Sequence, residues 1–423
     1  MSRLRQILRS QLGRSAGIFF AANVIGAAIP FLLLPVLTRY LSTEDYGIIT
    51  MFQVLVGMTV PFIGINAHGA ITRQYYRRDE LDFPQYVGNA LLILTGSTVI
   101  FGSITLLAAD FIEVWTDFPG NWLWSIIVMA AASFLVAMRG ALWRVEGKPI
   151  PYGIFFISLT AVELALALWL IVGRGMNWEG RVISRTAITG AFAILGLALL
   201  YRRGLIRLRF KPEYVRHALR FGAPLIPHTL GMWAITMTDR IFVTNMVNVA
   251  ETGLYAAGAQ IAMILNLVIA GFTSAWTPYL YERLQRNDPD ELRQVVRITY
   301  AAGASFLIVG LVLGLGAPPL MKYFLGPEFE DAGKFVLLLA MGNVSFGGYR
   351  LAVDYLFFEE RTRVIASITA TTAALNFFGN WLLIDLNGSI GAAQATFAAY
   401  TCSMVLVWIA AAKARPMPWN LLR

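Results

Sequence analysis

Charged side chains inside long apolar runs are the residues of this sequence most able to do chemistry. Asp239 and Arg240 stand side by side in "MTDRIFVTNMV" (237–247), and the preceding "FGAPLIPHTLGMWAIT" carries no charge beyond His228. A charge at the centre of a bilayer costs roughly 2.5 to 3.5 kcal/mol on insertion scales. The pair therefore needs a compensating partner or a function that uses it.

The position of this pair along its helix leaves two interpretations. Asp239 follows Phe221 by about 18 residues, which is roughly 27 Å of helix and reaches the outer boundary of a membrane. Adjacent side chains diverge by about 100° on a helix, so we expect Asp239 and Arg240 not to form a simple self-contained salt bridge. One of them would face a cavity while the other pairs with a neighbouring helix. In the alternative, both anchor the helix end at the interface.

Further polar groups in the apolar runs extend the set of candidates. Burial disfavours a charged carboxyl, so Glu163 is a candidate for ion coupling or, alternatively, a packed and paired structural group. Arg350 and Asp354 are four residues apart and are expected to pair near the inner face. Asn376 would line a polar cavity or bond across helices. The candidate substrate or cavity residues are Arg39, Arg139, Asp239, Arg240, Arg350 and Asn376.

Motifs of catalysis and of metal binding are absent from the sequence. It has no GxSxG, HExxH, Walker A or Asp-rich pyrophosphate motif, and its predicted outer loops are short. A single cysteine, Cys402, excludes internal disulfides and Cys-based metal sites, and the three histidines have no ligand spacing. We expect no enzyme activity, no ATP-driven pump within this chain, no cofactor and no metal.

Long apolar segments, which must position these residues, dominate the composition. The chain of 423 residues is 57% hydrophobic and 14% charged, far from the roughly 25% charged residues of soluble proteins. Segments of about 20 apolar residues cross a bilayer, so the sequence predicts an all-α polytopic membrane protein. The predicted spans are 16–38, 46–68, 86–109, 122–145, 152–173, 183–201, 219–244, 253–280, 295–316, 334–357, 364–384 and 389–412.

Lysine and arginine alternate between the predicted loops. Of the 34 in the chain, twenty-five fall on the side of the N-terminus, seven on the other side and two, Arg139 and Arg350, within spans, which favours cytoplasmic termini. The net charge of +9 therefore reflects membrane orientation and not nucleic-acid binding. We expect residues 1–15 to form an amphipathic cytoplasmic segment and residues 413–423 to form a cytoplasmic tail.

The most basic loop lies midway and divides the chain. We predict a six-helix bundle at 16–202, a basic cytoplasmic linker at 203–218 and a second six-helix bundle at 219–412. A weak internal match supports the division, because "LSTEDYGIITMFQV" (41–54) aligns with "VNVAETGLYAAGAQI" (247–261) and places Asp45 with Glu251. Both bundles run from inside back to inside, so the repeats are parallel.

Three stretches of this chain resemble bacterial polysaccharide flippases of the Wzx type, in the multidrug/oligosaccharidyl-lipid/polysaccharide superfamily. Residues 221–261 carry its Gly-x-Pro-x-x-Pro, Asp-Arg and Gly-x-Tyr pattern, and 34–53 resemble its first loop. Residues 374–400 resemble the family's turn between the eleventh and twelfth helices. The matching positions are Gly222, Pro224, Pro227, Asp239, Arg240, Gly253, Tyr255, Arg39, Gly47, Asn376, Asn380, Gly388, Gly391, Ala392, Ala393, Ala395 and Thr396.

The resemblance implies a MATE-like fold of about 12 helices around a central cavity that opens alternately to each side. The implied function is to flip undecaprenyl-pyrophosphate-linked oligosaccharides across a bacterial inner membrane for polysaccharide biosynthesis. A polymerase and a chain-length regulator are implied partners of a monomeric protein. An ion-coupled multidrug or cation antiporter is the main alternative; a membrane-embedded polymerase or ligase needs a large outer loop that this chain lacks.

Overall fold

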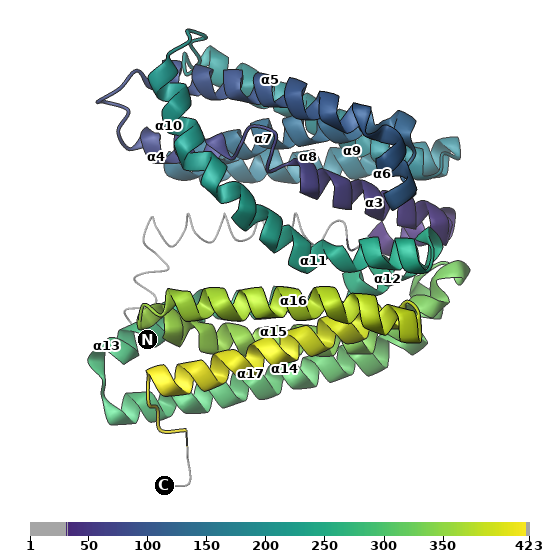
Figure 1. Cartoon of the computed structure of the whole chain (residues 1–423), viewed down its shortest axis with the longest axis vertical. Coiled ribbons are helices and arrows are strands. Elements are labelled where there is room, and N and C mark those ends of the chain that lie inside the picture. The colour runs from purple at the N-terminus through teal and green to yellow at the C-terminus, as the bar shows by residue number, and fades with distance from the viewer. Residues whose placement is uncertain (1–30, 32, 420–423) are drawn as a thin grey trace. The chain divides into compact units, whose positions relative to one another are not determined.

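Helices build both units of the chain. The computed structural model describes residue 31 and residues 33–419, and these contain no β-strand. The first unit ends at Thr236 and the second begins at Met237. In the first unit the helices are α3 (Thr43–Thr59), α4 (Ala67–Tyr75), α5 (Phe83–Leu107), α6 (Ala109–Thr116), α7 (Leu123–Val145), α8 (Pro149–Leu168), α9 (Trp178–Arg202), α10 (Pro212–Gly222) and the first part of α11 (Ile226–Met246) (Figure 1).

The second unit contains the rest of α11 and the helices that follow. They are α12 (Val249–Ala262), α13 (Ile264–Arg286), α14 (Pro289–Phe324), α15 (Gly333–Phe358), α16 (Thr362–Asn387) and α17 (Ile390–Ala414). The predicted amphipathic segment 1–15 lies outside the described residues, as does most of the first predicted span.

The described helices are suited to a bilayer. Eight of the helical segments in the described chain are long and apolar enough to cross a membrane. On α5 the large apolar side chains of Val99, Ile100, Ile104 and Leu107 are exposed. An apolar face of this size is unfavourable in water and favourable in lipid. The prediction of an all-α, multi-pass membrane protein is confirmed.

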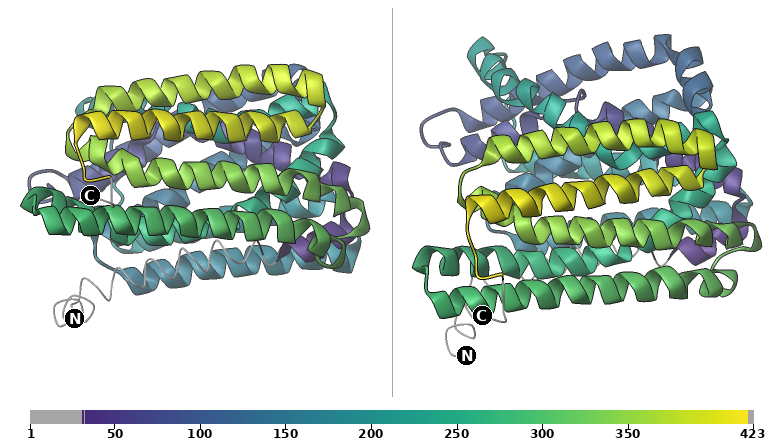
Figure 2. Two further views of the ribbon diagram at one scale, coloured as in Figure 1. Left: turned by 90° about the horizontal axis from the view of Figure 1, so that it is seen from below. Right: turned by 60° about the horizontal axis from the view of Figure 1, so that its bottom comes forward.

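The two units repeat one packing scheme. In the first unit α7 packs against α9 and α5, and α8 packs against α9. In the second unit α15 packs against α17 and α14, and α16 packs against α17. Figure 2 shows α16, α17, α15 and α14 side by side in that order. Since α7, α8 and α9 hold the same places in the chain order of their unit as α15, α16 and α17, the packing supports the internal repeat.

Helix capping supports the same alignment at the level of single residues. Ser42 caps α3 by accepting a hydrogen bond from the Asp45 N–H, and Asn248 caps α12 by accepting one from the Glu251 N–H. Each acid is the third residue of its helix, where a carboxylate also favours the helix dipole. The match of Asp45 with Glu251 is therefore a match of structure as well as of sequence.

Each of these two acids also ties its helix to a later helix of its unit, α9 in the first unit and α17 in the second. Asp45 Oδ1 accepts a hydrogen bond of 3.3 Å from the N–H of Trp178, the first residue of α9. Glu251 Oε2 accepts one from the hydroxyl of Ser389, which precedes α17. Lys334 adds an ion pair of 3.0 Å to Glu251. A carboxylate thus joins the corresponding helix ends in both units.

Two predicted spans prove to be interrupted. The span predicted at 46–68 is broken between α3 and α4, where Gly64, Ile65 and Asn66 adopt positive φ. The span predicted at 253–280 is divided at Met263 into α12 and α13. Hydropathy averaged over a window of about 20 residues does not register such breaks, because most of the residues on both sides of them are apolar. The spans predicted at 122–145 and 389–412 coincide closely with α7 and α17.

Helix α11 belongs to both units, because their boundary falls between Thr236 and Met237. In the first unit the indole N–H of Trp233 donates a hydrogen bond of 3.0 Å to the Val54 carbonyl of α3. One turn on, the hydroxyl of Thr236 donates to the carbonyls of Met232 and Trp233. Threonine hydroxyls that bond back to the preceding turn loosen a helix and often bend it.

A substitution at Gly222 tests the close contact between the junction of α10 and α11 and the backbone at Ile65. A Cβ at this position would lie 1.9 Å from the Ile65 carbonyl oxygen, whereas one at Gly231 would meet nothing within 4 Å. We expect Gly222→Ala to lower the free energy of unfolding by about 1–3 kcal/mol. Gly231→Ala should be neutral or slightly stabilising, since alanine favours a helix. Thermal unfolding of both variants in detergent checks this, and equal stability would contradict the contact.

Candidate functional site

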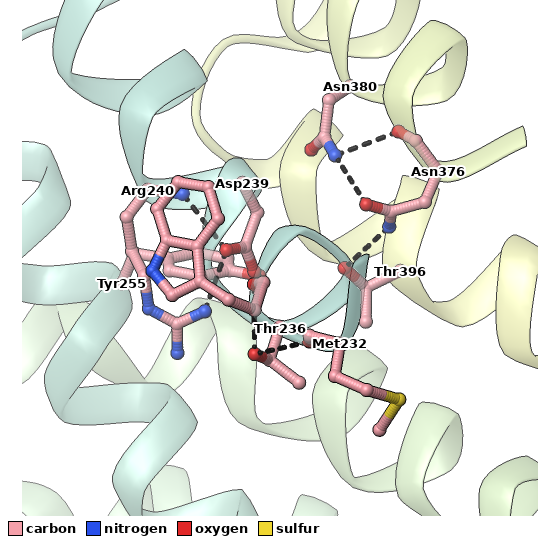
Figure 3. A network of polar contacts seen from close by, with 9 residues as sticks. Met232, Thr236, Asp239, Arg240, Tyr255, Asn376, Asn380 and Thr396 are labelled. Atoms are coloured by element: carbon pink, nitrogen blue, oxygen red, sulfur yellow. Dashed lines mark hydrogen bonds and ion pairs between the residues drawn. The ribbon is translucent and has the colours of Figure 1, made fainter. Parts of the chain in front are cut away.

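Asp239 and Arg240 form the centre of a polar network in the second unit. Asp239 Oδ1 accepts hydrogen bonds from the backbone N–H of Arg240 at 2.9 Å and from its Nη1 at 2.6 Å. The second oxygen, Oδ2, accepts a hydrogen bond of 2.6 Å from the hydroxyl of Tyr255 on α12. The Arg240 guanidinium also lies 5.5 Å from the centroid of the Tyr255 ring. Figure 3 shows the three side chains together.

This arrangement corrects one expectation and agrees with another. The expectation of no simple self-contained salt bridge is wrong in part. Asp239 and Arg240 do form an ion pair, because the short aspartate side chain turns back over the next peptide N–H and meets the guanidinium there. The pair is not self-contained, since Tyr255 also donates to the carboxylate. The expected contact with a neighbouring helix is present, and Tyr255 provides it. Asp239, with 6% of its surface exposed, is thus a buried charge whose two oxygens are both satisfied.

The helices α16 and α17 bring more polar groups to the same unit. Asn376 Nδ2 donates a hydrogen bond of 3.4 Å to Thr396 Oγ1, and Asn380 Nδ2 donates to the carbonyl and side-chain oxygens of Asn376. Thr396 also interacts with the hydroxyl of Tyr255. The structure therefore brings together three of the predicted residues, Asp239, Arg240 and Asn376, within the region drawn in Figure 3.

Arg139 lies in the first unit, buried in α7. Only 2% of its surface is exposed, and its guanidinium lies 3.7 Å from the centroid of the Trp143 ring. Its Nε and Nη1 have no hydrogen-bond partner. Leaving a buried charged donor unsatisfied costs about 1–3 kcal/mol or more, of which a cation–π contact returns only a part. This unsatisfied cation is a feature that packing alone does not explain.

Glu163 lies in α8 and is paired. Its Oε1 lies 2.9 Å from Nη1 of Arg181 on α9, and each residue is 8% exposed. Charge distribution along the sequence places Arg181 in an outer loop, but the structure places it inside the helix that begins at Trp178. The ion pair favours the interpretation of Glu163 as a packed and paired structural group.

Two other candidates lie apart from these groups. Arg350 is exposed on α15, and its Nη2 lies 3.5 Å from Thr273 Oγ1. The expected pair with Asp354 is not formed, because Asp354 instead accepts a hydrogen bond of 2.6 Å from Thr277 on α13. Their spacing of four residues permits a contact on the helix surface, but the hydroxyl of the neighbouring helix satisfies the carboxylate. Arg39 is exposed at the end of the helical residues 33–40.

Glu146, just beyond the end of α7, forms ion pairs with two basic residues. Its carboxylate accepts hydrogen bonds of 2.8 Å from Arg203 and lies 3.2 Å from Lys148. Burial acts to raise the pKa of Glu146, but the bonds and charges of Arg203 and Lys148 hold this pKa below its ordinary value. The carboxylate is therefore charged at neutral pH and joins the ends of α7 and α9.

Sequence reasoning missed Arg181 and Tyr255 as partners of the buried acids. Arg181 and Glu163 lie in different helices, α9 and α8, and Tyr255 follows Asp239 by sixteen residues. No spacing rule within one helix links such residues. The one available signal was physical, since a buried carboxylate requires a donor. Among the described residues, no group of three or more His, Cys, Asp or Glu is placed to hold a metal ion.

Comparisons with known proteins agree with this architecture. The family model described as "Polysaccharide biosynthesis protein" matches residues 12–283, and the MatE model matches residues 224–382. An uncharacterized membrane protein of Haemophilus influenzae is 25% identical over 88% of this chain and 91% of its own length. The probable flippase AglR of Haloferax volcanii is 24% identical over 96% of this chain and 84% of its own.

Solved structures show the same fold. An inward-facing multidrug resistance transporter of the MATE family matches with a TM-score of 0.73 at 13% identity, covering 92% of this chain and 94% of its own. The lipid II flippase MurJ in an inward closed conformation matches with a TM-score of 0.71 at 14% identity, covering 94% of this chain and 87% of its own. The predicted MATE-like fold is thereby confirmed.

The hydroxyl of Tyr255 can be tested as the second partner of Asp239. Tyr255→Phe should lower the free energy of unfolding by about 1.5–3 kcal/mol, because it leaves Oδ2 of a buried carboxylate without its donor. Tyr281→Phe is the matched control in the same unit, since Tyr281 packs on Phe358 and its loss of a hydroxyl should change stability by less than about 0.5 kcal/mol. Thermal unfolding measures both, and equal effects would contradict the assignment.

Proposed function

Because the chain belongs to the polysaccharide biosynthesis protein family, we propose that it is a flippase for lipid-linked oligosaccharides. Its family is one of membrane transporters and not of enzymes. The substrate would be an oligosaccharide repeat unit on undecaprenyl pyrophosphate, moved by alternating access from the cytoplasmic to the outer leaflet. The probable flippases AglR and Agl15 of Haloferax volcanii support this class of function by similarity.

The balance of buried charge carries the proposal. The buried charged residues of the described chain are Arg139, Glu163, Arg181 and Asp239, and the carboxylate of Glu146 is buried as well. All three acids are paired with arginine, Glu163 with Arg181, Asp239 with Arg240 and Glu146 with Arg203. Arg139 remains as a buried cation with unsatisfied donors. A pyrophosphate is an anion with many acceptor oxygens, and the planar guanidinium donates two parallel bonds to such a group.

An ion-coupled exporter of cations is the second candidate. The match of residues 224–382 to the MatE model favours it. Binding of a cationic drug, however, requires a carboxylate that is free to meet the ligand. The buried carboxylates of Glu146, Glu163 and Asp239 already form ion pairs, and the half-buried Asp354 accepts a hydrogen bond from Thr277. The charge balance therefore favours the anionic substrate.

The remaining assignments follow from the same proposal. The protein would lie in the bacterial cytoplasmic membrane as a monomer with both termini in the cytoplasm. It would supply repeat units to a polysaccharide polymerase and a chain-length regulator at the outer leaflet. Arg240, Asn376 and Arg350 are proposed as substrate contacts in the second unit and Arg39 as one in the first unit. Glu163 is the ion-coupling candidate if its pair with Arg181 opens during transport.

Reconstitution tests the function directly. The purified chain is inserted into liposomes that hold an isoprenyl-pyrophosphate-linked disaccharide with a fluorescent label in both leaflets. An impermeant quencher then measures how much label becomes accessible over time. We expect the chain to accelerate transfer well above that of protein-free liposomes. Efflux of a fluorescent organic cation under a proton or sodium gradient, without transfer of the labelled lipid, would support the antiporter and overturn the flippase.

Arg139 can be tested in the same liposomes. Arg139→Gln should lower the transfer rate by about tenfold or more, since it removes the charge and the paired donors that a phosphate meets. Arg139→Lys should keep a part of the activity, because it retains the charge without the planar fork.

Arg144→Gln is the matched control, because Arg144 is exposed one turn further along α7. It should leave the rate within about twofold of the unmodified chain. If folded Arg139→Gln protein transfers the lipid at an unchanged rate, Arg139 does not contact the substrate and only packs against the Trp143 ring.

A further inference from the structure

Helix α10 is amphipathic, and one of its faces packs against other helices of the first unit. It packs against α4 and α5, and Ala218 is buried on this face. The ring of His217 lies 2.8 Å from the Tyr86 hydroxyl and 3.0 Å from Gln74 Nε2. Burial of the imidazole, together with the charges of Arg73 and Arg77, lowers the pKa of His217 below its ordinary value. His217 therefore acts as a neutral anchor at pH 7.

The cations before and within α10 divide into two groups. Three are compensated by acids of the same unit: Arg203 pairs with Glu146, Arg207 with Asp82 and Lys211 with Glu213. Arg202, Arg209, Arg216 and Arg220 form no ion pair within the part of the chain that the structure describes. Of these four, Arg216 and Arg220 are one turn apart on α10, where their side chains are neighbours.

A groove of about 590 Å³ lies beside these two arginines. Apart from them its lining is apolar, consisting of Phe210, Pro212, Val215, Leu219, Ala223 and Pro224. Phe210 is 65% exposed, and the neighbouring Leu208 is 70% exposed. An apolar groove whose edge carries two guanidinium groups that form no ion pair in the described chain suits a ligand that joins a phosphate to a hydrocarbon chain.

We propose that this groove binds an anionic glycerophospholipid, with its phosphate on Arg216 and Arg220 and the start of an acyl chain against Val215 and Leu219. The charge distribution of the sequence supports this occupant, because the segment lies on the Lys- and Arg-rich side of the membrane. Basic amphipathic segments bind anionic lipids there by electrostatic attraction together with apolar burial. The bound lipid holds α10, and with it the start of α11, at the membrane surface.

This site is distinct from the proposed transport function and needs no oligosaccharide. An isoprenyl pyrophosphate shares the chemistry of phosphate and hydrocarbon and is the other source of such a ligand. The groove favours the phospholipid because its two guanidinium groups suit one phosphate, and bulk phospholipid surrounds the helix at all times.

Photo-crosslinking of the full chain tests the site. The probe is a phosphatidylglycerol with a photoreactive group near the top of one acyl chain, used in nanodiscs of phosphatidylcholine. Peptide mass spectrometry should locate the label within residues 208–224. The Arg216→Gln/Arg220→Gln variant should lose about tenfold or more of this label. Both side chains are exposed, so the variant is expected to fold, and its thermal unfolding is measured alongside.

The matched control is Arg202→Gln/Arg209→Gln, which removes the same charge from the same segment outside the groove. It should retain more than about half of the label, because only local pairing with phosphate is lost in the first variant. Equal loss in the two variants would overturn the site in favour of diffuse surface attraction. Equal labelling by a phosphatidylcholine probe would reduce it to an apolar groove. Competition by isoprenyl pyrophosphate at trace amounts, with none by excess phosphatidylglycerol, would assign the groove to that lipid instead.

Discussion

Lipid offers no partner to a charge removed from water, so most buried charges of this protein are paired within their own unit, and Arg139 is the exception. Glu163 meets Arg181 of the next helix, and Asp239 meets Arg240 and Tyr255. Each contact also fixes the rotation of one helix about its axis relative to another, which apolar packing in a bilayer specifies only weakly. The buried polar groups therefore determine which faces of the helices turn inward.

Apolar length was enough to predict most of the fold. The runs at 122–145 and 389–412 became α7 and α17 with almost the expected ends, and the weak match of Asp45 with Glu251 proved to be a shared helix cap. The break near Met263 has no signal in the sequence, whereas the one near Ile65 follows Pro61, which disfavours a continuous helix but does not specify the backbone beyond it. Ile65 adopts positive φ, a backbone state that its branched side chain disfavours and that only the packing around it can impose.

The site was predictable in its residues but not in its contacts. Asp239, Arg240 and Asn376 were identified from their unusual position in apolar segments. The direction of the Asp239 side chain was not, because helical spacing describes Cβ vectors and neglects the rotamer that brings a short carboxylate back over its neighbour's N–H. Arg350 and Asp354 show the opposite error, since favourable spacing was outweighed by the Thr277 hydroxyl from another helix.

The position of α11 has a mechanical consequence. Trp233 is tied to Val54 in the first unit and Asp239 to Tyr255 in the second, so fewer than two turns of helix lie between the two attachments. The peptide bond between Thr236 and Met237 is also the covalent connection of the two units. Residues 234–238 are therefore a short stretch of α11 held at both ends. The Thr236 hydroxyl lies within this stretch and bonds back to the preceding turn, which favours a bend of α11 at this point.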